Sequence, residues 1–220
     1  MSDATLFQLR FLKLAIVGAF LIAFVAPNAV ASPLPISEAG WNDGVVVLVG
    51  DKVLSGELHY NAVHQLVLLR SDDGKTITTL TTRQVQRFFY YNPQDNIIHR
   101  FLAIEQHPRH AYAVRSFYEV VAEGPVLYLR QPNQCSAQPP PGSNPHVVAF
   151  RYFAYYRGKM IRAHAFRKEL LPTLVQENPG LIDYMKSQQL KPYHVGDQIM
   201  LVNRFNRQFS GPLAELRTFR

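Results

Sequence analysis

The most suggestive chemistry in the sequence lies in a cluster of cationic and aromatic residues that begins near position 150. The segment FRYFAYYRGKMIR (150–162) places arginine and lysine among phenylalanine and tyrosine. Guanidinium groups beside aromatic planes bind carboxylates, phosphates and sugar rings. In a competing interpretation, the aromatic residues of a strand pair form core and the arginines cover its wet face. The residues predicted to contact an anionic partner are Arg151, Tyr155, Arg157, Lys159 and Arg162.

Histidine gives a weaker signal. His107 and His110 are separated by Pro108, which opposes the helical presentation that a two-histidine metal site needs. A loop site that adds His99 and Glu105 to this pair remains an alternative. Because metal coordination demands a closely defined geometry, we predict no metal and no cofactor.

Cys135 is the only cysteine of the chain, so no intramolecular disulfide can form. It lies in a proline-rich stretch without a preorganised partner, and we expect an unreactive thiol there. A disulfide with another chain remains an alternative.

Local signatures of enzymes are missing from the sequence. It contains no G-x-S-x-G elbow and no phosphate-binding glycine loop, and spacing cannot select a pair of acidic residues for glycoside cleavage. We therefore predict no catalytic residue, and whether the protein is an enzyme stays open. A non-enzymatic binding or interaction module is favoured, and the alternative is an envelope hydrolase whose site is assembled from dispersed residues.

The N-terminal segment has the layout of a secretory signal peptide. Arg10 and Lys13 precede an apolar run over 14–26, and Ala29-Val30-Ala31 provides a small-residue cleavage site. A retained membrane anchor is the competing interpretation, but the run is shorter than the roughly 20 residues that a helix needs to cross a bilayer. We predict cleavage after Ala31 and export to the periplasm or the cell exterior.

Positive charge is concentrated in the last third of the chain. Residues 32–145 carry 9 basic and 10 acidic side chains, whereas residues 146–220 carry 12 basic and 5 acidic ones. Export argues against a nucleic-acid partner for this basic region. The expected partner is another envelope protein or an anionic glycan or lipid surface, while the oligomeric state is not predicted.

Hydrophobic alternation and turn residues organise the chain that must position these groups. A signal peptide (1–31) precedes a β-rich body (32–130), a proline-rich loop or linker (131–146), and a β-hairpin with a helical part (147–220), which may form one unit with the body. Within the body, Phe117, Val120 and Val121 have helical spacing and predict a short helix over 115–123. Strands are expected over the following ranges: 45–49, 52–60, 64–70, 76–82, 85–90, 97–104, 126–130, 147–156 and 161–166.

The C-terminal part is expected to form three helices. The first lies near 168–177 with Pro172 in its first turn, the second follows Asn178 and Pro179, and the third runs over 195–209. The predicted fold class is α+β. It consists of an antiparallel meander or barrel-like body with a short inserted helix, together with three C-terminal helices.

Six segments keep a particular order along the chain. They are GDKVLSGEL (50–58), TTRQVQRF (81–88), FYEVVAEGPVLYL (117–129), YFAYYRGKMI (152–161), FRKELLPTLVQENPGLIDYMKSQQL (166–190) and VNRFN (202–206). In this order they resemble a family of secreted or periplasmic proteins of unknown function that is abundant in Bacteroidota. The resemblance implies export and the architecture above, and no activity or catalytic residue comes with it.

Overall fold

The computed structural model describes residues 40–71, 74–106, 113–133 and 149–209. All of these residues belong to one compact unit. The predicted signal peptide with its cleavage site, the His107 and His110 pair, Cys135 and most of the proline-rich segment lie outside the described residues.

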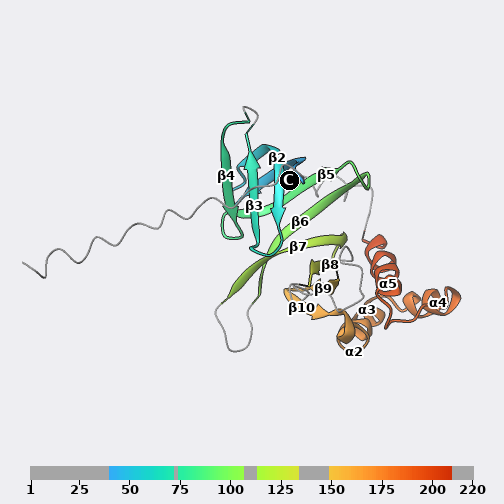
Figure 1. Cartoon of the computed structure of the whole chain (residues 1–220). Coiled ribbons are helices and arrows are strands. Elements are labelled where there is room, and N and C mark those ends of the chain that lie inside the picture. The colour runs from blue at the N-terminus through green and yellow to red at the C-terminus, as the bar shows by residue number, and fades with distance from the viewer. Residues whose placement is uncertain (1–39, 72–73, 107–112, 134–148, 210–220) are drawn as a thin grey trace, which may run out of the picture. The chain divides into compact units, whose positions relative to one another are not determined.

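Ten strands form one antiparallel sheet in the order β10-β9-β8-β7-β6-β5-β1-β2-β3-β4 (Figure 1). Strands adjacent in sequence are paired, except that β5 returns beside β1 instead of β4. The strands are β1 (Asn42–Leu48), β2 (Val53–Asn61), β3 (Leu66–Arg70), β4 (Ile77–Thr81), β5 (Val85–Asn92), β6 (Ile97–Gln106), β7 (Val114–Ala122), β8 (Leu127–Pro132), β9 (Phe150–Tyr156) and β10 (Lys159–Arg162). The antiparallel strand-rich body is confirmed. The sheet is not closed, since β4 and β10 are its edges in the described residues, so the barrel-like form is not observed.

Two of the expected hairpin turns have the backbone that their residues favour. Gly50 and Asp51 have φ values of 93° and 62°, and Arg157 and Gly158 have φ values of 48° and 78°. Consecutive positive φ values match the right-handed twist of the flanking strands and make a tight turn. The second turn brings β9 and β10 together, so the basic hairpin forms as predicted.

The predicted helix over 115–123 is wrong, because these residues belong to strand β7. Phe117 and Glu119 face one side of the sheet, and Tyr118 and Val120 face the other. Valine and aromatic residues suit a pleated surface with neighbours on both sides. The apparent helical spacing was therefore a coincidence of an alternating strand that is apolar on both faces.

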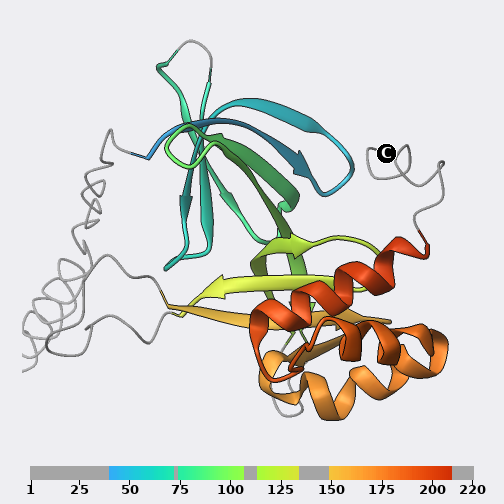
Figure 2. The same ribbon diagram turned by 90° about the vertical axis from the view of Figure 1, so that its right-hand side faces the viewer.

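Helices follow the last strand and pack against the C-terminal part of the sheet (Figure 2). They are the 3-10 turn η2 (Ala163–Ala165) and the helices α2 (Phe166–Glu169), α3 (Leu171–Glu177), α4 (Gly180–Ser187) and α5 (Val195–Arg207). Pro172 lies in the first turn of α3, and the Asn178 side chain accepts the amide of Gly180 at 3.1 Å, as the sequence predicted. The first predicted helix is split into α2 and α3, and β10 ends at Arg162, before the predicted 166.

Two buried amide side chains attach α5 to the sheet. Asn206 donates to the carbonyl oxygens of Glu123 (3.0 Å) and Val126 (2.8 Å) and accepts the Val126 amide (3.0 Å). Gln198 accepts the Tyr128 hydroxyl and donates to backbone carbonyls that precede and follow α2–α4. Both residues are almost fully buried. The apolar stripe predicted for α5 missed these polar contacts.

The sheet buries apolar side chains on both faces. Side chains alternate between the two faces along β7 and β8. One face carries both the core of β1–β7 and the core that lies between the C-terminal strands and the helices. The opposite face of β6–β10 carries a smaller cluster that includes Tyr118, Leu129 and Phe153. We call these the network face and the pocket face, after the polar groups that each one holds.

Candidate functional site

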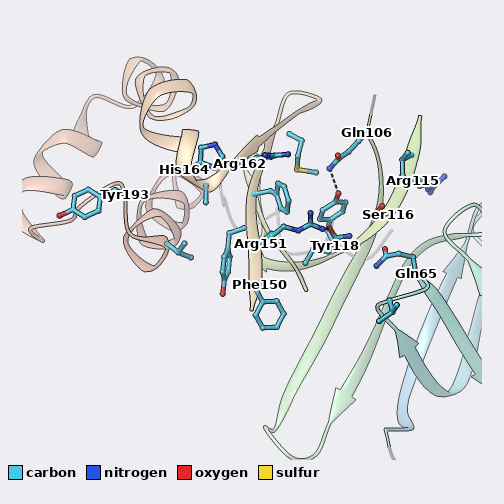
Figure 3. Close-up of a pocket in the computed structure, with 18 residues that line it drawn as sticks. Gln65, Gln106, Arg115, Ser116, Tyr118, Phe150, Arg151, Arg162, His164 and Tyr193 are labelled. Carbon is cyan, nitrogen blue, oxygen red and sulfur yellow. Dashed lines mark hydrogen bonds between the residues drawn. The ribbon is translucent and has the colours of Figure 1, made fainter. Parts of the chain in front are cut away.

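A pocket of about 990 Å³ opens on the pocket face of the sheet (Figure 3). Its walls come from the β2–β3 turn, the ends of β6 and β7, the strands β8–β10, η2 and the start of α5. Segments from residue 63 to residue 195 therefore meet around one hollow.

Strand pairing explains how distant residues reach this pocket. Gln131 in β8 is paired with Arg151 in β9, and Phe153 is paired with Arg162 in β10. Paired residues project to the same side of a sheet. The basic hairpin consequently presents Arg151 and Arg162 on the face that also bears Tyr118.

Arg151 is held in the pocket by neutral partners. Its Nη2 donates to Oε1 of Gln131 at 2.9 Å, and Nε2 of Gln131 donates to the carbonyl oxygen of Phe117 at 3.3 Å. Figure 3 shows Arg151 directed toward Tyr118, whose hydroxyl accepts a hydrogen bond from Gln106. This chain of amides orients the guanidinium without neutralising it.

Burial raises the pKa of the Tyr118 hydroxyl above its ordinary value, while the nearby Arg151 charge acts in the opposite direction. The phenol is therefore protonated at neutral pH. A neutral hydroxyl beside an arginine can both donate to and orient an anionic group.

The pocket carries positive charge without acidic compensation. Arg151, Arg162 and His164 line it, as does Arg115, whose side chain leaves β7 on the same face as Phe117. None of its described lining residues is aspartate or glutamate. Neither Arg151 nor Arg162 forms an ion pair with any carboxylate in the described ranges.

Arg115 is only partly satisfied. Its Nη2 donates to the carbonyl oxygen of Val85 at 3.3 Å, and its buried Nε has no hydrogen-bond partner in the described structure. An unsatisfied buried donor is costly. Because Arg115 alternates with Tyr118 along β7 and shares the face of Phe117, its donors are directed away from Arg151.

Apolar side chains form the remaining surface of the pocket. The Tyr118 and Phe153 rings meet edge to face with centroids 5.5 Å apart, and Met160 packs against the same cluster. Val63 and Val114 extend the apolar surface outward. The pocket thus combines cations with an aromatic and aliphatic wall.

The structure divides the residues that the sequence assigned to an anion contact. Arg151 and Arg162 line the pocket. Tyr155 is half-buried against the pocket-face cluster. Arg157 pairs with Glu177 at 3.1 Å and Lys159 with Glu169 at 2.9 Å, so both are already engaged with carboxylates of the helices.

A buried charged network on the network face was not foreseen from the sequence. His99 contacts Glu119 through Nδ1 (2.8 Å) and Asp95 through Nε2 (2.9 Å). Arg130 donates to both oxygens of Glu119, each at 2.7 Å, and lies over the Phe150 ring. Glu119 is thus shared by two donors from neighbouring strands. This arrangement also occupies His99, which the alternative metal site would need.

The described hydrogen bonds do not assemble a familiar catalytic centre. No serine hydroxyl is bonded to a histidine within the described ranges, and no group of three histidine, cysteine or acidic side chains there could hold a metal ion. The arrangement is suited to binding, since it supplies fixed cations, neutral donors and an apolar wall.

A second hollow, of about 420 Å³, lies on β1, β2, β5 and β6. Its lining includes the exposed side chains of Phe89, Tyr91 and Ile98, and its charged lining residue is Asp43. It offers no described cation for an anionic partner. The predicted anion contact therefore has its best match in the larger pocket.

Comparisons of the chain with protein family models, with curated proteins and with solved structures find no match. The resemblance to the Bacteroidota family stays a prediction. Among the described residues, no helix has both the length and the apolar character needed to span a membrane.

Proposed function

We propose that the protein is a binding module that takes an anionic ligand into the pocket formed by β7–β10 and η2. The observation that carries the proposal is the presence of Arg151, Arg162 and His164 around one pocket without an acidic lining residue in the described chain. Cations with no internal counter-charge gain most when an anion arrives.

The ion pairs of the other two cations in the hairpin support this assignment. Arg157 and Lys159 lie in the same hairpin but are neutralised by carboxylates of α3 and α2. In each pair the carboxylate already supplies the counter-charge that an anionic ligand would bring. The two arginines on the pocket face are the ones that remain available.

Export is part of the proposal, supported by the resemblance of the N-terminal sequence to a secretory signal peptide with a predicted cleavage site after Ala31. The ligand would then be an anionic molecule of the periplasm, envelope or exterior, such as an anionic glycan, a lipid headgroup or an acidic group of another envelope protein. The competing hydrolase would need a nucleophile or a general base in the pocket. The described lining includes His164, Ser116 and Tyr118 as candidates, but no hydrogen bond of the described residues joins His164 to Ser116.

Calorimetric titration of the mature chain with succinate, inorganic phosphate, glucuronate and octanoate tests the proposal. Arg151→Gln should weaken binding of the best ligand by about tenfold, because a charge-assisted hydrogen bond is lost. Arg157→Gln is the matched control, since it removes an arginine of the same hairpin that is already paired. Equal effects of the two substitutions, or no binding by any of the four anions, would overturn the proposal.

A further inference from the structure

We infer that the ligand is an amphiphile, with an anionic head at Arg151 and an apolar chain that lies along the aromatic and aliphatic wall of the pocket. This inference rests on the proposed function and adds the chemical class of the ligand. The observation behind it is that cations and apolar side chains line the same pocket side by side: Phe153 lies two residues from Arg151 along β9 and is paired with Arg162 of β10.

Tyr118 offers both a polar and an aromatic surface to the pocket. Its hydroxyl is bonded to Gln106 and lies near the Arg151 charge, whereas its ring packs edge to face on Phe153. A ligand with its head at Arg151 therefore has an aromatic surface directly beside the head. From there, Met160 continues the wall along β10.

Three exposed apolar or aromatic side chains also line the pocket, from three different segments of the chain. Val63 is 70% exposed, Val114 is 53% exposed and Tyr193 is 61% exposed, and all three line the pocket. Exposed apolar groups gathered at a hollow indicate a surface that a partner covers. In this pocket, that partner would also have to satisfy the arginines.

The size of the pocket also favours a ligand larger than a simple anion. At about 990 Å³ it lies at the upper end of the usual range for small-molecule sites. A carboxylate or phosphate group alone would occupy the cationic part and leave the wall in contact with water. Chain atoms that cover the wall should each add affinity, by about fourfold per buried methylene.

Methionine is well suited to line a site for a flexible chain. Met160 is half-buried and has an unbranched, adaptable side chain that can follow a ligand of irregular shape. Both alkyl carboxylates and alkyl phosphates provide the required chemistry. The experiment must therefore separate the two kinds of head.

The test titrates the mature chain with acetate, butanoate, hexanoate and octanoate, and with the alkyl phosphates of the same chain lengths, below their micellar concentrations. Affinity should rise by about fourfold per methylene until the wall is covered. Met160→Gln should reduce this increment, and Met160→Leu should preserve it. Arg151→Gln should weaken every member of the better series by a similar factor.

Each other outcome has a defined meaning. Binding of short and long anions with equal affinity would overturn the inference and leave the proposed function standing, as would stronger binding of glucuronate than of any alkyl anion. Chain-length dependence that is unaffected by Arg151→Gln would indicate an apolar site and would overturn the proposed function. Failure of all the anions to bind would overturn both. A preference for one series identifies the head as carboxylate or phosphate.

Discussion

The two faces of strands β7–β9 use the same kinds of charged residue in opposite ways. On the network face, Arg130 shares Glu119 with His99, and Asp95 completes the set. On the pocket face, one strand away, Arg151 is held by the neutral Gln131. One face balances its charges internally, and the other leaves its cations uncompensated.

We interpret the charged residues of the network face as stabilising the fold and the arginines of the pocket face as binding a ligand. A buried arginine needs a carboxylate, because removing an ion from water is costly unless a partner and hydrogen bonds replace the water. Arg151 and Arg162 stay exposed enough to keep their hydration. The free protein therefore loses little stability by having no described acidic partner for these arginines. An anion that enters the pocket can pair with them.

The largest expected effect comes from breaking the network. Glu119→Ala should lower the free energy of unfolding by about 3–5 kcal/mol, because Arg130 and His99 would lose the carboxylate that they share in a buried setting. Urea denaturation measures this change. Glu119→Gln, which keeps the size and one acceptor oxygen, should cost less. A loss below about 1 kcal/mol for the alanine variant would mean that the network does not support the fold.

The second prediction tests whether the buried hydrogen bonds between α5 and the sheet also stabilise the fold. Asn206→Ala should cost about 2 kcal/mol, because three backbone groups of Glu123 and Val126 would lose their partner. Gly124 should be equally sensitive: its φ is 146°, and an added Cβ would lie 2.5 Å from Asn206. Denaturation by urea again gives the cost, and Asn203→Ala on the exposed side of α5 is the control. A similar cost for both alanine variants would show that the Asn206 hydrogen bonds do not stabilise the fold.

A much smaller change is expected from the pocket face. Arg151→Gln should alter the free energy of unfolding by less than about 0.5 kcal/mol, since its hydrogen-bond partner is a neutral amide and the side chain is exposed. Removing one of several like charges could even raise stability at low ionic strength. A loss comparable to that of Glu119→Ala would show that Arg151 holds the sheet together and would remove the contrast between the faces.

Local patterns in the sequence accounted for the turns and most of the elements. Gly50, Asp51, Gly158 and Pro172 act through their own backbone preferences, so they could be recognised without knowledge of the fold. Strand β7 could not, because its two-sided burial depends on β6 and β8 pairing with it. The strands that pair with β7 are not encoded in its own residues. Local helical spacing could not reveal them and therefore predicted the wrong element.

The same difference between local and non-local information explains which parts of the site could be predicted from the sequence. Alternation could place Arg151 and Tyr155 on one face of a strand, and both do lie on the pocket face. It could not show that Glu177 lies beside Arg157, or that Tyr118 lies near Arg151, because these neighbours come from other elements. The network of His99 and Glu119 joins residues 20 apart in the sequence and required the register of β6 and β7.

The smallest predicted effect uses two tyrosines as reporters of the charge on each face. On the network face, burial and then the carboxylates of Glu119 and Asp95 raise the pKa of Tyr90 to about 12, with Arg130 acting in the opposite direction. On the pocket face, burial raises the pKa of Tyr118 and the Arg151 charge opposes the rise. Tyr90 therefore reports on neighbouring carboxylates, whereas Tyr118 reports on the positive charge of Arg151.

Arg151→Gln should therefore raise the pKa of Tyr118 further, and Asp95→Asn should lower that of Tyr90. Both tyrosines are harder to ionise in the folded protein than in the unfolded chain, so their contribution to stability is complete below pH 10 and is lost as the pH rises through the folded values. NMR of ¹³Cζ-labelled tyrosine follows each phenol. Arg157→Gln should leave Tyr118 unchanged, because that arginine is paired with Glu177. If Arg151→Gln lowered the pKa of Tyr118 or left it unchanged, Arg151 would not set the potential in the pocket, and the contrast between the two faces would lose its electrostatic basis.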